Sequence, residues 1–267
     1  MLSLKRLFAI SNIRQTMQVI RFPISMAVNE VNIRYARTSL GPWWQTINML
    51  ILSVVLSFVF AKIFKVPVEQ FLPFLITGLI FWNFMQAVMV DSSVCLVRSR
   101  NLILNTVNPI WIYSLKLVIK ALIQLLHHIV LIPIAIYYFD IDIGLMDVLM
   151  FLVGIMVLTS ILILASNILA IIGSRLHDLE QVITNIMQVM FYATPIIWMP
   201  SLLGGRVFYL DYNPLYHLIN TCRIPIIGGD MQIWQNSIMF SIALLIFLIL
   251  FNYYVYRRYS KMVPYWV

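Results

Sequence analysis

The chain has 267 residues, of which 62% are hydrophobic and 10% are charged, with a mean hydropathy of +0.92 and a formal net charge of +8. A soluble domain carries about 25% charged residues, so this composition excludes an ordinary soluble globular protein. It is typical of a helical membrane protein, and the apolar stretches of the chain leave no room for a soluble domain of typical size.

Six long stretches contain no charged side chain, and each approaches or exceeds the roughly 20 residues that a helix needs to cross a bilayer. They are continuously apolar and lack the alternation of a membrane β-strand. The sequence therefore predicts an all-α membrane protein whose six transmembrane helices occupy residues 43–256. The stretches are Trp43–Ala61, Phe71–Val90, Ala121–Phe139, Val148–Ser174, Gln181–Gly205 and Met231–Tyr256.

Basic residues are divided unequally between the two sides of these spans. Six spans place both termini on one side, which then holds twelve Lys and Arg residues against four on the other, leaving aside Lys116 and Lys120. The positive-inside rule makes the richer side, with both termini, cytoplasmic. We interpret the net charge as a topology signal and not as a nucleic-acid-binding patch. The twelve are Lys5, Arg6, Arg14, Arg21, Arg34, Arg37, Arg98, Arg100, Arg175, Arg257, Arg258 and Lys261; the four are Lys62, Lys65, Arg206 and Arg223.

Residues 1–42 should form a cytoplasmic N-terminal segment with an amphipathic helix over Met26–Leu40. One predicted face carries Val28, Val31 and Tyr35, and another carries Glu30, Arg34 and Arg37. Leu40-Gly41-Pro42 should end this helix just before Trp43 and Trp44, at the membrane boundary. A basic amphipathic helix at this depth lies in the membrane plane. It serves either as an anchor or as a docking surface for a cytoplasmic partner.

The cytoplasmic loop of residues 91–110 follows the second span. An apolar patch over Asn101–Asn105 stands behind Arg98 and Arg100, and Asn108-Pro109 ends it. This pattern predicts a short helix that presses into a cleft of another protein, or else an ordinary basic loop.

Residues 173–183 connect spans four and five. Asp178 and Gln181 have the spacing of a capping box, so a helix should begin near Asp178. Arg175, Asp178 and Glu180 form a dense charge cluster beside two apolar spans. The segment is either a solvated turn or a gate at the cytoplasmic mouth.

Residues 200–230, after span five, are too apolar for an exposed loop and too broken for two further spans. Pro195 and Pro200 should kink or end span five, and Asn213-Pro214 should start a short helix over Leu215–Ile224, closed by Pro225 and Gly228-Gly229. Backbone of this kind is tolerated where it is buried in protein or lines a cavity. We therefore expect re-entrant helices on the outer side.

Aromatic side chains make up 13% of the chain. Flat rings suit a sliding sugar chain because they stack without requiring one register, although for each single residue packing or lipid contact is the favoured explanation. The candidates in spans two and five are Trp82, Phe84, Phe191, Tyr192 and Trp198.

Ionisable groups are almost absent from the predicted spans, which argues against a proton- or ion-coupled transporter. His127 and His128 are the exception, but neighbouring helical positions diverge by about 100°, so we expect packing or pore-lining roles and no metal site. The sequence contains no phosphate-binding loop and no recognisable hydrolase triad. Cys95 and Cys222 fall on opposite sides of the membrane and should be structural.

Three motifs resemble the membrane subunit of type-2 ATP-binding-cassette exporters, specifically the permeases of bacterial O-antigen, capsule or teichoic acid chains. They are NIRYARTSLGPWW (Asn32–Trp44), SRLHDLEQVITNIMQVMFYATPIIW (Ser174–Trp198) and NPLYHLI (Asn213–Ile219). The resemblance covers nearly the whole chain, since the order of the spans and connections also matches.

The resemblance implies that this chain is a transport subunit of the bacterial inner membrane and not an enzyme. Two copies would form the pore, with two copies of a separate ABC ATPase beneath, which would hold the ATP and magnesium; this chain would hold no cofactor. The substrate would be a polysaccharide on a polyprenyl diphosphate, pushed through a channel lined with aromatic side chains. Membrane lipids would be further partners. Nucleic acid is not an expected partner.

The same resemblance implies roles for particular residues. The residues that would couple to the ATPase are Glu30, Arg34, Tyr35, Arg37, Arg98, Arg100 and Asn101. The cytoplasmic gate would consist of Arg175, His177, Asp178 and Glu180. The periplasmic re-entrant region would include Asn213, Pro214, Tyr216 and His217. Residues 257–267 would be a cytoplasmic tail. We further expect Arg34, Arg37 and Arg175 to attract the diphosphate of the lipid.

Two alternatives remain open at the level of the sequence. The chain could export a small drug or a lipid, as other type-2 permeases do. It could also be a membrane enzyme or an assembly subunit without transport of its own, although no catalytic constellation supports an enzyme.

Overall fold

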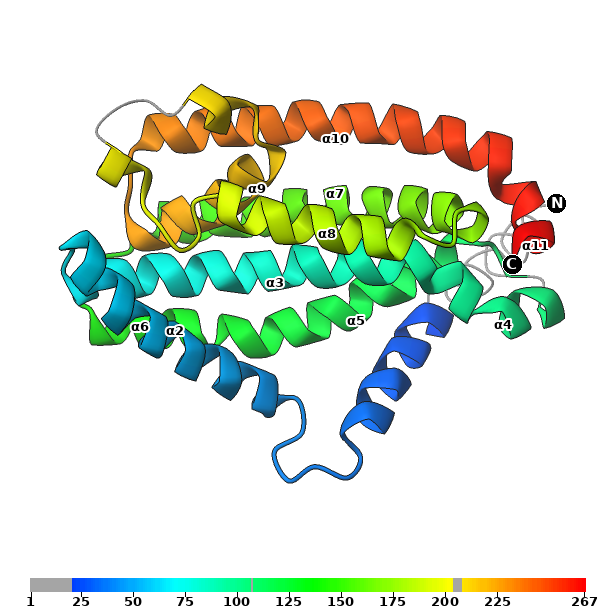
Figure 1. Cartoon of the computed structure of the whole chain (residues 1–267), viewed down its shortest axis with the longest axis horizontal. Coiled ribbons are helices and arrows are strands. Elements are labelled where there is room, and N and C mark those ends of the chain that lie inside the picture. The colour runs from blue at the N-terminus through cyan, green and yellow to red at the C-terminus, as the bar shows by residue number, and fades with distance from the viewer. Residues whose placement is uncertain (1–20, 107, 204–207) are drawn as a thin grey trace, which may run out of the picture.

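The computed structural model describes residues 21–106, 108–203 and 208–267. These residues form helices and no strand (Figure 1), which confirms the all-α prediction for them. The N-terminal helix covers residues 21–35. The later elements are α2 (Trp43–Phe64), α3 (Val68–Arg98), α4 (Arg100–Asn105), α5 (Trp111–Ile129), α6 (Leu131–Tyr138), α7 (Leu145–Arg175), α8 (Leu179–Ala193), the 3₁₀ turns η1 (Pro200–Leu203) and η2 (Phe208–Tyr212), α9 (Pro214–Ile227), α10 (Met231–Tyr259), η3 (Ser260–Met262) and α11 (Val263–Trp266).

Five segments of the described chain are long and apolar enough to cross a membrane. They are Trp43–Phe64, Val68–Arg98, Trp111–Tyr138, Leu145–Arg175 and Met231–Trp266. The third comprises α5 and α6, which are separated at Val130. Pro133 lies in the first turn of α6 and has no N–H to continue the ladder of α5, which accounts for the break.

The expected span Gln181–Gly205 is not one long helix. Its helix, α8, has 15 residues, or about 22 Å at 1.5 Å per residue, against a hydrocarbon core of about 30 Å. Thr194 is extended, as a residue before proline usually is, and so α8 ends ahead of Pro195. The described residues 176–203 and 208–230 nevertheless lead from the end of the bundle where α7 finishes to the end where α10 begins (Figure 1).

The helices extend beyond the charge-free stretches. The expected loop 91–110 is helical up to Arg98, and the third span begins at Trp111 instead of Ala121. A helix does not end where the first charged residue appears, because its backbone bonds persist in water. Asp91, Lys116 and Lys120 therefore lie on helices.

The N-terminal helix ends at residue 35, ahead of the expected Leu40, and its buried stripe differs from the expected one. Pro23, Ala27 and Val31 are buried at four-residue intervals, the spacing of one helical face. Val28, predicted on the apolar face, is 40% exposed.

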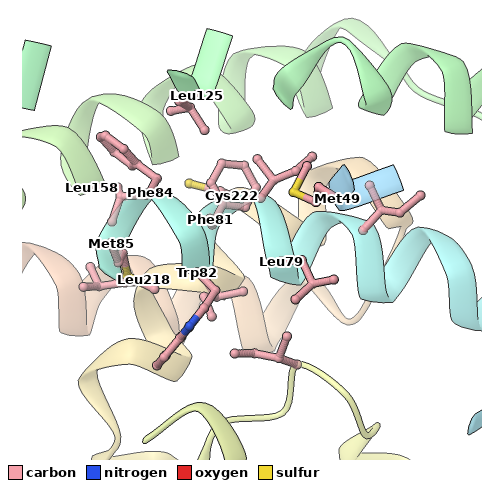
Figure 2. Close-up of a cluster of buried hydrophobic side chains, with 14 of the residues drawn as sticks. Met49, Leu79, Phe81, Trp82, Phe84, Met85, Leu125, Leu158, Leu218 and Cys222 are labelled. Atoms are coloured by element: carbon pink, nitrogen blue, oxygen red, sulfur yellow. The ribbon is translucent and has the colours of Figure 1, made fainter. Parts of the chain in front are cut away.

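The central helix of the bundle is α3. In the most apolar 18 residues of α3, 78% of the residues are buried, whereas the share is 11% in the segment Met231–Trp266 that contains α10. The helix α3 therefore forms the core, and α10 lies at the periphery. It contacts α2, α5, α7, α8 and α9. Figure 2 shows Phe81, Phe84 and Met85 of α3 among side chains that come from the surrounding helices.

Two glycines let α7 approach its neighbours closely. A Cβ atom at Gly173 would overlap the carbonyl of Ser93 on α3, and one at Gly154 would overlap the carbonyl of Thr221 on α9. Small residues at such crossings allow helix backbones to pack in membranes. The contact at Gly173 fixes α7 against the end of α3.

We expect Gly173→Ala to destabilise the protein by about 1–3 kcal/mol, the usual cost of overpacking, because both colliding groups are backbone. The measurement is the temperature at which the detergent-purified protein loses its monodisperse peak in size-exclusion chromatography. Gly144→Ala is the control, since its Cβ would meet only Asp147 Oδ2 at an ordinary 3.5 Å. Equal melting of the two variants would contradict the close-packing argument.

Candidate functional site

The end of the bundle that carries α4 presents a short helix with an exposed outer face. Ile103 is buried and fixes α4 to the core, whereas Leu102 and Leu104 are 37% and 52% exposed. Arg100 and Asn101 are exposed beside them. The predicted short helix is thus present, and it combines apolar and basic side chains on a surface that no described residue covers.

Two lysines on α5 are buried at the same end of the molecule. Lys116 and Lys120 are one helical turn apart, and their side chains are only 8% and 13% exposed. Glu30 of the N-terminal helix pairs with Lys116 Nζ at 2.5 Å and lies 4.0 Å from Lys120 Nζ. Glu30, expected to face a partner protein, is therefore already paired within the chain, and it holds the N-terminal helix against α5.

The ion pairs continue through α3 to α8. Asp91 Oδ2 accepts a hydrogen bond of 2.9 Å from Lys120 Nζ, and Asp91 Oδ1 lies 3.8 Å from Arg98 Nη1. Arg98 Nη2 in turn donates a 2.9 Å hydrogen bond to Glu180 Oε1 on α8. We call these six residues the charge network: Glu30, Asp91, Arg98, Lys116, Lys120 and Glu180. The network joins the predicted coupling residues Glu30 and Arg98 to the predicted gate residue Glu180.

The two ends of the charge network differ in strength. Arg98 and Glu180 are 61% and 42% exposed in their side chains, and exposed pairs contribute about 0.2–1 kcal/mol. Removal of one partner from a buried pair costs about 3–5 kcal/mol, because the other charge is left uncompensated. In the Lys116–Glu30 pair the lysine is 8% and the glutamate 40% exposed, so this link to α5 is stronger than the exposed link to α8, which is easily broken.

Asp91, Lys116 and Lys120 are members of the charge network that the sequence reading left out. The two lysines precede the third charge-free stretch, so the topology count assigns them to neither side of the membrane. Their spacing of four residues on an amphipathic segment was the available signal, because it places both on one helical face.

The other coupling residues of the N-terminal segment are not joined to the charge network. Arg34 and Arg37 are exposed, and the hydroxyl of Tyr35 is buried without a hydrogen-bond partner among the described residues. Arg34 and Arg37 remain free to contact a partner or lipid headgroups, whereas Tyr35 packs within the molecule.

The predicted gate segment is exposed at Arg175, His177 and Asp178. The helix begins at Leu179, as expected, but Asp178 makes no capping hydrogen bond, and Gln181 bonds Asn185 instead. The guanidinium of Arg175 lies 5.7 Å from the centre of the Trp266 ring on α11.

The end of the chain is folded back onto the bundle. Val263 of α11 is fully buried in a cluster with Cys95, Ile103 and Ile171. The C-terminal residues therefore pack against the base of α4 and the end of α7, where Arg175 lies.

Four of the five candidate aromatics lie together. The ring centres of Trp82 and Phe191 are 5.4 Å apart, and those of Phe191 and Tyr192 are also 5.4 Å apart. Trp198 Nε1 donates a 3.0 Å hydrogen bond to the carbonyl of Tyr192. Phe84 is the exception, since it projects from the opposite side of α3 to Trp82 (Figure 2). Among these aromatics only Tyr192, 61% exposed, has a largely open ring.

The residues expected in the re-entrant region start and anchor α9. Asn213 Oδ1 accepts hydrogen bonds from the backbone N–H groups of Leu215 and Tyr216 at 3.0 and 3.3 Å, and Pro214 occupies the first turn. The His217 ring lies 3.1 Å from Ser237 Oγ and 3.0 Å from the Asp211 carbonyl, and it stacks on Phe240. Tyr216 is 9% exposed. These contacts are internal.

The helix α9 continues through Pro225 to Ile227 and ends at Gly228, so the predicted stop at Gly228-Gly229 is confirmed and the predicted stop at Pro225 is wrong. Proline removes the N–H that would bond the carbonyl of Thr221. That carbonyl instead accepts a 3.1 Å hydrogen bond from Trp234 Nε1 on α10. The helix can therefore pass through Pro225 and end at Gly228, which has a positive φ of 66°.

Arg223 was counted only as a basic residue of an outer loop, yet it is 2% exposed. Its guanidinium donates hydrogen bonds to the Pro195 carbonyl at 2.8 Å and to Asn220 Oδ1 at 2.7 Å, and lies 4.0 Å from the Phe74 ring centre. Arg223 thus ties the bend after α8 to α9 and α3.

We expect Glu30→Gln to destabilise the protein by about 1–3 kcal/mol, since it leaves the Lys116 ammonium, 8% exposed, without its carboxylate, whereas Glu180→Gln should cost less than about 1 kcal/mol. The comparison uses thermal melting in detergent at one pH. The neutral change Asp178→Asn, at an exposed residue outside the charge network, is the control. Equal destabilisation by Glu30→Gln and Glu180→Gln would contradict a difference in strength between the two ends of the charge network.

Comparison with known proteins assigns this arrangement to a class. The family model described as ABC-2 type transporter matches residues 24–227. Two relatives from Klebsiella pneumoniae, each named O-antigen export system permease protein RfbA, are 25% and 26% identical over 236 residues, which cover 85% of this chain and 90% of each relative. A protein of the same name from Myxococcus xanthus is 21% identical over 212 residues, or 78% of this chain and 81% of the relative. The chain belongs to the ABC-2 type transporter family of membrane permeases.

Proposed function

We propose that this chain is the transmembrane subunit of an ATP-driven exporter that carries a polyprenyl-diphosphate-linked polysaccharide, such as O-antigen, across the bacterial inner membrane. Two copies form the path, and two copies of a separate ABC ATPase bind beneath them. The names of the relatives support the substrate, because the similarity covers most of both chains. This chain acts as a transport subunit, and its partner binds ATP and magnesium.

The observation that carries the proposal is the exposed face of α4. Leu102 and Leu104 project beside Arg100 from the end of the bundle, and α4 follows α3 after Ser99 alone. Exposed apolar side chains rimmed by polar ones are typical of a protein interface. The ATPase that docks there would act directly on the central helix of the permease.

The distribution of charge supports a cytoplasmic position for this end. Figure 1 places α4, the end of α7 and the C-terminus at one end of the bundle. That end holds Arg98, Arg100, Arg175, Arg257, Arg258 and Lys261, whereas the turn between α6 and α7, at the other end, holds Asp140 and Asp142. The asymmetry agrees with the positive-inside rule.

The path of residues 176–230 supports six crossings and a re-entrant region. They run back along the bundle as α8, η1, η2 and the buried helix α9 (Figure 1). Broken backbone is tolerated at membrane depth where protein covers it. We propose that α8 and the segment after it form the fifth crossing, and that α9 dips into the outer leaflet from the periplasmic side.

Charge reversal with a polar change on α4, Arg100→Glu with Leu104→Glu, should release the ATPase. The chain is expressed with its neighbouring genes, extracted in mild detergent and purified through a tag, and the ATPase that remains bound is quantified. Arg98 is left unchanged because it pairs with Glu180 inside the molecule. We expect the variant to lose most of the ATPase, since a buried interface rejects unpaired charges.

The matched control for this release is Lys62→Glu, a charge reversal at an exposed residue of α2. It should retain the ATPase as the wild type does. Equal retention in all three proteins would contradict docking at α4.

Deletion of the gene should leave the glycan on the cytoplasmic side of the inner membrane and remove it from the cell surface. Surface glycan is measured with intact cells by periodate labelling, and total lipid-linked glycan is measured after lysis. The wild-type chain should restore the surface signal. An unchanged surface signal in the deletion strain, with altered tolerance of small apolar toxins, would favour the small-substrate alternative.

A further inference from the structure

A cleft with a volume of about 540 Å³ opens between α2, α3, α5 and α8. This size lies within the range of about 300–1,000 Å³ that small-ligand sites occupy. Its floor includes apolar side chains of the core, among them Phe84 and Leu125. None of its lining residues is a lysine or an arginine.

The polar lining of the cleft comes from three helices that each contribute a pair at helical spacing. Residues three or four apart lie on the same helical face, so each pair points to one side of its helix. The pairs are Gln45 and Asn48 on α2, Asn83 and Gln86 on α3, and Gln124 and His128 on α5; Thr184 of α8 completes the set.

Four of these polar side chains form no hydrogen bond with the described residues, and His128 is the buried one among them, whereas Asn48 is exposed and Gln45 and Gln124 are half-buried. Within the described part of the chain, the side chains of Gln45, Asn48 and Gln124 form no hydrogen bond. His128 is 7% exposed, and neither of its ring nitrogens has a hydrogen-bond partner among the described residues. Polar groups at membrane depth usually pair or face a water-filled cavity, and a buried polar group without a partner costs free energy.

The chemistry of the lining selects the kind of ligand. Side-chain amides both donate and accept hydrogen bonds, which suits neutral hydroxyl groups, whereas the Phe84 ring of the floor is only 3% exposed and belongs to the apolar core. A diphosphate would require a cationic side chain, and the cleft has none in its lining. The one carboxylate of the lining, Asp91, is already paired with Lys120 and Arg98.

We propose that this cleft binds the carbohydrate part of the exported glycan through its hydroxyl groups, with the amides and His128 as hydrogen-bonding partners. The inference rests on the proposed export function and specifies which residues hold the sugar. At the edge of the cleft Gln86 Oε1 accepts a 3.0 Å hydrogen bond from Trp82 Nε1, so the proposed sugar site borders the Trp82–Phe191 aromatic pair.

The first test is photo-crosslinking in cells that express the chain with its neighbouring genes and export their own glycan. A benzophenone amino acid replaces Ala87, which lines the cleft, or Leu126, which is 65% exposed on α5 and does not line it. After irradiation and denaturing purification, the adducts are stained for periodate-oxidisable glycan. We expect glycan adducts at position 87 and only background at position 126.

The second test replaces two amides that support no internal contact. Asn48→Leu with Gln124→Leu should reduce surface glycan by about tenfold or more, the factor for loss of one to two hydrogen bonds. Asn48→Ser with Gln124→Asn retains hydrogen-bonding groups and should keep most of the export. Leucine favours membrane insertion, so the leucine variant should match the wild type in membrane abundance. Both variants should also bind as much ATPase as the wild type, because the cleft lies away from α4.

The outcomes separate the cleft from the export function. If the wild type exports glycan but position 87 gives none, or gives a crosslink to a second copy of the chain instead, the cleft proposal alone is overturned. Full export by the leucine variant would overturn it as well. If the wild-type chain moves no glycan to the surface, the proposed function is wrong and the cleft proposal falls with it.

Discussion

The buried charges of Lys116 and Lys120 impose the arrangement of this end of the molecule. Two cations on one face of α5, with side chains 8% and 13% exposed, require carboxylates at close range. Glu30 and Asp91 supply them from two different helices. The N-terminal helix must therefore lie against α5, and the last turns of α3 must lie beside it. Because only Ser99 separates α3 from α4, the same requirement fixes the docking surface that we propose for the ATPase.

Elements with local signals could be predicted from the sequence. The short helix α4, the start of α8 near Asp178 and the start of α9 at Asn213-Pro214 follow from residues within a few positions of each boundary. Helix length was not predictable in the same way, since a charge-free stretch marks where lipid can lie and not where the backbone stops. The break of α8 ahead of Pro195 shows the converse, because the apolar stretch continued beyond the helix.

Contacts between distant residues could not be predicted. Glu30 and Lys116 are 86 residues apart, and Arg98 and Glu180 are 82 apart. The burial of Arg223 likewise depends on a bend and a ring that come from α8 and α3. In a nearly uniform apolar run no periodicity marks the interior face, so the amides of α2, α3 and α5 gave no sign that they meet. The sequence does predict that Trp82 and Phe84 point in different directions, since residues two apart on a helix lie on different sides.

The contacts of α8 make its two ends mechanically different. Near its C-terminal end, Phe191 packs on Trp82, Thr194 Oγ1 accepts a 3.0 Å hydrogen bond from Asn213, and the Pro195 carbonyl is held by buried Arg223. Near its N-terminal end, the ion pair of Glu180 with Arg98 is exposed and easily broken. Because α4 follows α3 after Ser99 alone and α3 is largely buried, a displacement of α4 would act directly on α3. We therefore expect α8 to pivot about its C-terminal end. Thr184, one turn beyond Glu180, lines the cleft between α2, α3, α5 and α8. The pivot would move Thr184 across this cleft, so the exposed ion pair would couple the proposed docking surface to the width of the proposed sugar site.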